Sequence, residues 1–126
     1  MPQNFLALAL FTVTGCAIAM DSNAQVVKQD VEGIRNFAKI ESTVACAGTI
    51  TPAAIKGIKE MGYASIFNLR LASEQGADIE GNIAAAKAAG IPYFHIPFSA
   101  TEPDSASVDT FLKLIQTPGV QPAFIH

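Results

Sequence analysis

The sequence has no tryptophan, only two cysteines and no cluster of basic residues. Its 8 Lys and Arg residues are scattered and are outnumbered by 11 Asp and Glu residues, which gives a net charge of −3. A nucleic-acid-binding surface needs a basic patch, so we expect no nucleic-acid partner. Two cysteines cannot build a disulfide framework. With two histidines and dispersed carboxylates the sequence shows no metal-ligand cluster either, and we expect no metal and no other cofactor.

Charged side chains are also absent from the first 20 residues, where residues 5–13 are apolar apart from one Thr. This run is too short to span a bilayer, but it matches the apolar region of a secretory signal. Cleavage after Ala19, cleavage after Ala24 and acylation of Cys16 in a lipoprotein-like context all stay open. We therefore expect residues 1–24 to be a signal peptide or lipoprotein leader, and the protein to be exported, as a periplasmic, secreted or lipid-anchored protein. A buried or disordered N-terminal segment is the alternative, because no basic residue precedes the run.

Residues 25–42 mix charged and polar side chains and link this leader to the rest of the chain. Val31, Ile34 and Phe37 have partial helical spacing, so the segment is interpreted as a linker or an N-terminal helix. Residues 43–126 then form a single candidate domain, which is the size of one small folded unit.

Short β-prone runs alternate with helical apolar patterns throughout this domain. The predicted strands are residues 43–47, 64–69, 92–97 and 123–126, and the predicted helices are residues 52–61, 79–89 and 108–115. Thr51 and Pro52 suit the start of the first helix, and Gly90 suits the end of the second. Such alternation predicts a three-layer α/β fold: a mostly parallel sheet of about four strands with right-handed crossover helices.

In sheets of this kind ligands bind beyond the carboxyl ends of the strands. Gly48, Arg70 and His126 each stand at such an end. A guanidinium at a strand end can bind a phosphate or pair with a carboxylate such as Glu74, and both interpretations of Arg70 stay open. Asn68 is expected to hold the adjacent loop through backbone hydrogen bonds.

Several short segments occur in an order and spacing typical of one family. They are Gly48, residues 66–70 followed by Glu74, residues 84–97 and residues 124–126. In these features residues 47–126 resemble bacterial dual-specificity or tyrosine phosphatase-like domains. The resemblance is closest to the beta-lactamase-hydrolase-like phosphatase group and to the phosphatase domains found fused to an NAD kinase.

The resemblance implies a Cys-dependent mechanism. In the family a His at the end of a strand is followed by Cys, five further residues and Arg. The loop between them wraps a phosphate with backbone N–H groups at a helix N-terminus. The Cys thiolate attacks phosphorus, an acid protonates the leaving oxygen, and water hydrolyses the phosphocysteine.

Only part of this machinery has a counterpart in the sequence. His126 matches the family's His, which supports the Cys loop, although in the chain as given we expect its side chain to be solvated. Glu102 and Asp104 are candidate acids, and Asp104 is equally suited to cap a helix. The sequence contains no nucleophile in the required context, because Cys46 has Pro52 rather than Arg six positions later. We therefore expect a phosphatase-like domain truncated just before its catalytic loop and inactive as given.

Two other interpretations stay open. The domain could be a non-catalytic module that binds a phosphate or a partner. It could also be a fragment of a rhodanese-like sulfurtransferase, since residues 68–70 with Glu74 resemble a strand-end pattern of that family, but the full helix at residues 79–89 favours the phosphatase. Whether the chain is an enzyme is left undecided. The expected partner of a complete domain is a phosphorylated protein or a small phosphoester, with membrane contact only through a lipid on Cys16.

Overall fold

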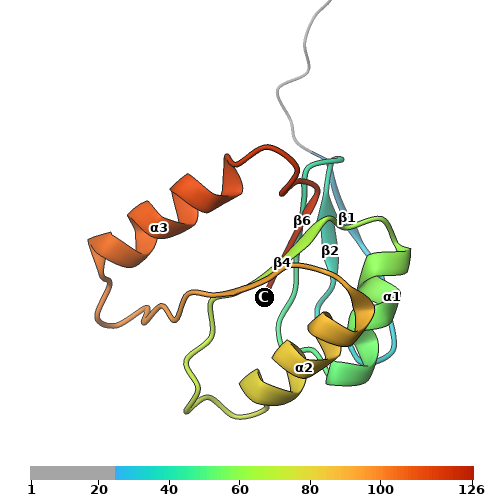
Figure 1. Ribbon diagram of the computed structural model, residues 1–126, viewed down its shortest axis with the longest axis horizontal. Coiled ribbons are helices and arrows are strands. Elements are labelled where there is room, and N and C mark those ends of the chain that lie inside the picture. The colour runs from blue at the N-terminus through green and yellow to red at the C-terminus, as the bar shows by residue number, and fades with distance from the viewer. Residues whose placement is uncertain (1–24) are drawn as a thin grey trace, which may run out of the picture.

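A computed structural model of the protein describes residues 25–126; the predicted signal or leader, residues 1–24, lies outside this part. The fold is a six-stranded sheet in the order β1-β2-β3-β6-β4-β5 (Figure 1). Its strands are β1 (Val26–Lys28), β2 (Ala38–Ile40), β3 (Val44–Cys46), β4 (Ser65–Asn68), β5 (Tyr93–His95) and β6 (Ala123–Ile125). The helices are the 3-10 turn η1 (Pro52–Ala54), α1 (Ile55–Glu60), α2 (Ile79–Ala89) and α3 (Ser105–Ile115). Within residues 25–126 no helix has both the length and the apolar character that crossing a membrane requires.

Strands β3, β6, β4 and β5 are parallel neighbours, which confirms the predicted mostly parallel sheet. Strand β6 lies between β3 and β4, with Phe124 paired to Ala45 on one side and to Ile66 on the other. The strand that leads to His126 is therefore central. All four residues of β4 are buried, as expected for a parallel strand covered on both faces.

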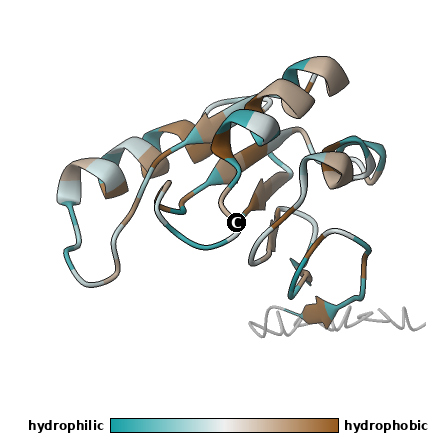
Figure 2. Cartoon of the chain, turned by 90° about the horizontal axis from the view of Figure 1, so that it is seen from below, coloured by the Kyte–Doolittle hydropathy of each residue, from teal (hydrophilic) through white to brown (hydrophobic). Residues whose placement is uncertain are grey.

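Helices cover both faces of the sheet and complete the three-layer α/β fold that the sequence predicts. Helices α1 and α2 lie on one side of the strands and α3 on the other (Figure 1). The apolar strands, coloured brown, lie among helices of mixed colour in Figure 2. Each face has its own core: Phe37, Tyr63 and Phe124 belong to the first, and Phe67, packed with Phe111, to the second.

Local signals explain where the longer helices begin and end. The Asp78 side chain accepts a hydrogen bond from the Gly81 N–H at 2.9 Å and caps α2. Gly90 ends that helix in the left-handed region, at φ 67°, where a residue without a Cβ is favoured. Asp104 caps α3 in the same way as Asp78 caps α2. Thr51 occupies the capping position of η1 as predicted, but its side chain makes no capping hydrogen bond.

The prediction of a linker or helix for residues 25–42 needs correction. This segment forms β1 and β2, which pair antiparallel with each other and extend the sheet beyond β3. The spacing of Ile34 and Phe37 suggested a helix, but Gly33 and Asn36 adopt φ values of 77° and 54°, which a right-handed helix excludes. Both apolar side chains reach the core from a turn instead. The sheet consequently has six strands rather than about four.

Candidate functional site

The carboxyl ends of the parallel strands bring three sequence-predicted positions to one edge of the sheet. Gly48 follows β3, Arg70 follows β4 and His126 follows β6. The His126 N–H donates to the Phe67 carbonyl at 2.8 Å, and the Leu69 N–H donates to the His126 carbonyl at 2.7 Å. This ladder fixes the start of the Arg70 loop directly beside His126.

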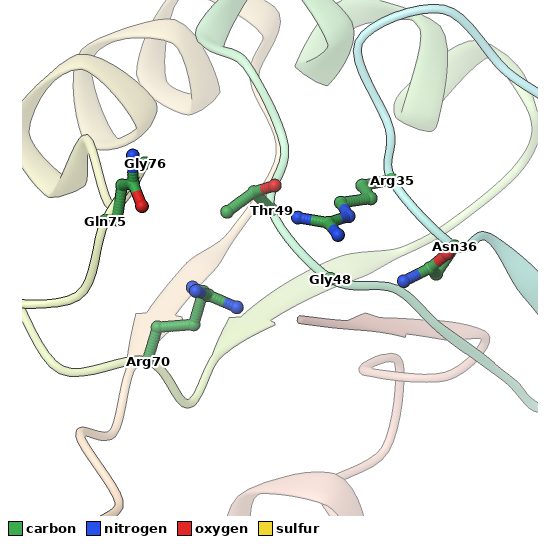
Figure 3. A pocket seen from close by; sticks show the side chains of 7 residues that line it. All are labelled: Arg35, Asn36, Gly48, Thr49, Arg70, Gln75 and Gly76. Atoms are coloured by element: carbon green, nitrogen blue, oxygen red, sulfur yellow. The ribbon is translucent and has the colours of Figure 1, made fainter.

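A cavity of about 450 Å³ opens at this edge. It lies among the loop after β3, the loop after β4 and the turn before β2, and its lining contains two arginines and no carboxylate (Figure 3). The lining residues are Arg35, Asn36, Gly48, Thr49, Arg70, Gln75 and Gly76. Two cationic groups in a lining without carboxylates make such a hollow suited to an anion.

Arg70 contributes a guanidinium that is held from one side only. Its Nη2 lies 2.8 Å from Glu74 Oε2, and the side chain is 25% exposed. Glu74 is itself tied down, because its Oε1 accepts the Leu71 N–H at 2.9 Å. Arg70 Nε is buried and has no hydrogen-bond partner among residues 25–126. The pairing with Glu74 therefore forms, and phosphate binding by Arg70, which lines the cavity, stays a prediction.

Arg35 is the second cation, and sequence reasoning missed it. Its backbone is clamped to the sheet edge: the Gly48 N–H donates to the Arg35 carbonyl at 2.8 Å, and the Arg35 N–H donates to the Thr49 carbonyl at 2.9 Å. Figure 3 shows its side chain extending from the turn toward the same hollow as that of Arg70. The turn-forming residues Gly33 and Asn36 were the only sequence feature that could have indicated the position of Arg35. Interpreting this segment as a linker left Arg35 out of the predicted site.

His126 is buried, with only 6% of its surface exposed, so the expectation of a solvated side chain is wrong. The central position of β6 explains the difference, because the ring lies beside those of Tyr93 and Phe124, at centroid distances of 6.2 and 6.3 Å. Asn68 Nδ2 donates to the Tyr93 hydroxyl at 2.7 Å, and that hydroxyl lies 3.5 Å from His126 Nε2. Asn68 Oδ1 accepts the Arg70 N–H at 2.9 Å, which confirms that Asn68 holds the loop.

Burial lowers the pKa of His126 to about 4, helped by the positive charge of Arg70 and opposed by the nearby Gly48 carbonyl. The imidazole is therefore neutral at pH 7, with one donor and one acceptor nitrogen. Its Nδ1 has no hydrogen-bond partner of good geometry within residues 25–126. A neutral ring can hold a neighbouring loop through a hydrogen bond without adding charge.

The two candidate acids lie at the far end of the loop that leads into α3, which runs away from α1 and α2 (Figure 1). Asp104 accepts hydrogen bonds from the N–H groups of Ala106 and Ser107 and from the Ser107 hydroxyl. These bonds lower the pKa of its exposed carboxyl group, which makes the protonated form scarcer. Glu102 is exposed and its carboxylate makes no recorded bond in the described chain. Capping by Asp104 is thus observed, and an acid role for either residue stays a prediction.

Cys46 lies in β3 as a half-buried free thiol. Burial raises the pKa of this thiol, so little of the nucleophilic thiolate forms at neutral pH. Within residues 25–126 no group of three or more His, Cys, Asp or Glu side chains could hold a metal ion.

No protein-family model and no curated protein sequence matches the chain. Solved structures do match. A "putative phosphatase (DUF442)" from Shewanella putrefaciens superposes with a TM-score of 0.65 at 22% identity, over 75% of this chain and 62% of the other. A "putative phosphatase" from Neisseria meningitidis gives 0.58 at 23% identity, over 69% of this chain and 63% of the other. The core catalytic domain of the PP-IP phosphatase SIW14 from S. cerevisiae, in complex with citrate, gives 0.52 at 21% identity, over 66% and 49%. The chain thus has a Cys-phosphatase-like fold and spans less than two thirds of the length of these similar proteins.

Proposed function

We propose that the chain forms the N-terminal portion of a Cys-dependent phosphomonoester phosphatase domain of the dual-specificity type. The observation that carries this proposal is the placement of His126. It ends the central parallel strand, next to the Arg70 loop and a hollow with cationic lining. The likeness to structures described as phosphatases supports it at the level of the fold.

In this proposal a phosphomonoester enters the cavity with its phosphate toward Arg70. The guanidinium of Arg70 donates to a phosphate oxygen, while Glu74 keeps it oriented. Neutral His126 holds the loop that carries a Cys after it. The thiolate attacks phosphorus as the P–O bond to the leaving group breaks, and Glu102 or Asp104 gives that oxygen its proton. Water then cleaves the phosphocysteine and releases phosphate. The substrate is a phosphorylated protein or a small phosphoester.

The coding DNA beyond the codon for His126 tests this proposal directly. We expect it to encode Cys, five further residues and Arg. A different residue at the Cys position would contradict the enzyme and leave a non-catalytic phosphate-binding module as the second candidate. That candidate is supported by the cavity, whose lining residues all precede His126.

Activity provides the second test. We expect the purified 126-residue chain not to hydrolyse p-nitrophenyl phosphate above a tag-only control, because it contains no Cys followed by Arg six positions later. The chain carried on through its natural Cys loop should hydrolyse it.

In that longer chain, Arg70→Gln should reduce kcat/KM by roughly tenfold or more, because a charge-assisted hydrogen bond to the phosphate is lost. The matched control Lys56→Gln removes the same charge from an exposed ion pair and should leave activity unchanged.

We further propose that the protein is exported. The support is the charge-free, largely apolar start of the sequence. Mass spectrometry of the mature N-terminus would separate cleavage after Ala19, cleavage after Ala24 and lipidation at Cys16, and an intact Met1 in the cytoplasm would contradict export.

A further inference from the structure

Arg35 differs from Arg70 in its electrostatic surroundings. Among residues 25–126 no carboxylate lies within ion-pairing distance of its guanidinium, whereas Arg70 is paired with Glu74 at 2.8 Å. The backbone of Arg35 is nevertheless fixed at the sheet edge by its two hydrogen bonds to Gly48 and Thr49. Two guanidinium groups thus share one hollow, and only one of their charges is balanced (Figure 3).

The hollow also extends beyond Arg35. A second cavity of about 400 Å³ shares Arg35, Thr49 and Gly76 with the first and reaches Gly33 and Thr51. Its lining contains no carboxylate either. Arg35 therefore stands where the two hollows join, while Arg70 lines only the first.

Like charges that converge without an acid between them repel one another, and an anion placed between them relieves that repulsion. A phosphate held by Arg70 leaves Arg35, which lines the same cavity, free for another negative group. The volumes of both hollows lie in the range of small-ligand sites.

We propose that the cavity takes a small phosphomonoester that carries a second anionic group, with the phosphate at Arg70 and the second anion at Arg35. This inference rests on the proposed function and adds to it the class of substrate. Arg35 is accordingly the residue that determines specificity, and it selects for the second charge through a charge-assisted hydrogen bond.

A matched pair of ligands tests the proposal on the 126-residue chain. 3-Phosphoglycerate and glycerol 3-phosphate share a carbon skeleton and a phosphate, and they differ in a terminal carboxylate against a hydroxymethyl group. Isothermal titration of each should show 3-phosphoglycerate binding at least roughly tenfold more tightly, as expected for one added charge-assisted contact.

Variants assign the preference to its residue. Arg35→Gln should bring the affinity for 3-phosphoglycerate down to that for glycerol 3-phosphate and leave the latter unchanged. Arg35→Lys should keep part of the preference, and Lys56→Gln, which removes an exposed charge elsewhere, should keep all of it. Arg70→Gln should weaken both ligands. Melting curves identical to that of the parent chain verify that each variant is folded.

The outcomes separate this inference from the proposed function. Equal affinity for the two ligands, or a preference that survives Arg35→Gln, overturns the inference while the phosphate site stands. Absence of glycerol 3-phosphate binding, or binding that is insensitive to Arg70→Gln, contradicts the phosphate site itself. A phosphotyrosine peptide that binds more tightly than 3-phosphoglycerate would overturn the assignment to a small ligand.

Discussion

The imidazole of His126 is buried beside the positive charge of Arg70, and both features favour its neutral form. An unfolded chain exposes the same ring to water, where its pKa is 6.5, compared with about 4 in the folded chain. As the pH falls, the unfolded state therefore takes up this proton first. The resulting contribution to stability is fully present above pH 6.5 and is lost as the pH falls toward 4.

The pH dependence of unfolding tests this shift. Between about pH 6.5 and 4 the free energy of unfolding should fall by roughly 3 kcal/mol through His126 alone. In His126→Gln that part of the slope should vanish, leaving only the contribution of the remaining titratable groups. Urea denaturation at a series of pH values measures both chains. Identical slopes would show that His126 is not shielded, and an NMR titration of its ring near pH 6.5 would show the same.

Tyr93 offers a test of the hydrogen-bond network around His126, because its hydroxyl is the acceptor for Asn68 Nδ2 at 2.7 Å. Tyr93→Phe keeps the ring but leaves that buried amide without its acceptor, so we expect a loss of about 1–3 kcal/mol in urea denaturation. Tyr63→Phe is the matched control, since the Tyr63 hydroxyl makes no recorded hydrogen bond in the described chain. An equal loss in both variants would contradict the network around His126.

Helix α3 shows how one carboxylate can serve as a cap, as an acid or as both. Asp104→Ala removes the bonds to the N–H groups of Ala106 and Ser107 and should measurably lower the free energy of unfolding. Asp104→Asn keeps a capping side chain and should cost far less. Asp109→Ala, which removes an exposed charge within the same helix, is the control.

In the chain carried on through a Cys loop, a large loss of kcat in Asp104→Asn with unchanged stability would assign the acid role to Asp104. Unchanged kcat would exclude it.

Individual helices and strands show which parts of the fold could be predicted from the sequence and which could not. Helix α2 was predictable from its helical apolar pattern and from Gly90 at its end, whereas the Asp78 cap is a finding of the structure. Strand β4 was predictable from a short β-prone run, and the structure buries all four of its residues between two layers. The β1–β2 pair was not, since Ile34 and Phe37 reach the core from a turn whose positive φ values at Gly33 and Asn36 no apolar periodicity reveals.

The whole molecule depends on Phe124, where the N-terminal strands and the parallel sheet meet. Its ring stacks on Phe37 at a centroid distance of 5.8 Å and meets Tyr63 edge-on at 5.6 Å. Phe124→Ala should cost about 3–5 kcal/mol, a large share of the stability of a small domain. Leu112→Ala, at a side chain 47% exposed on α3, should cost far less. A small loss in Phe124→Ala would contradict the central place of this ring in the core that it shares with Phe37 and Tyr63.

In the candidate site, too, some residues could be located from the sequence and others could not. Arg70 and His126 could be located from sequence because both end predicted strands, and parallel strands end at one edge. Arg35 could not, because it reaches that edge only through two backbone bonds to Gly48 and Thr49, made by a segment with no recognisable strand pattern. The burial of His126 likewise depends on β6 being central, which no short-range signal encodes.

We infer that the described residues build an anion site at the carboxyl edge of the sheet. The most direct measurement is a ¹⁵N–¹H titration of the 126-residue chain with phenyl phosphate. We expect saturable shifts confined to the backbone of His126 and of the residues that line the cavity, which are Arg35, Asn36, Gly48, Thr49, Arg70, Gln75 and Gly76. These shifts should disappear in Arg70→Gln and persist in Lys56→Gln. Absence of saturable shifts at this edge, or shifts equally strong at exposed lysines and unaffected by Arg70→Gln, would contradict the account.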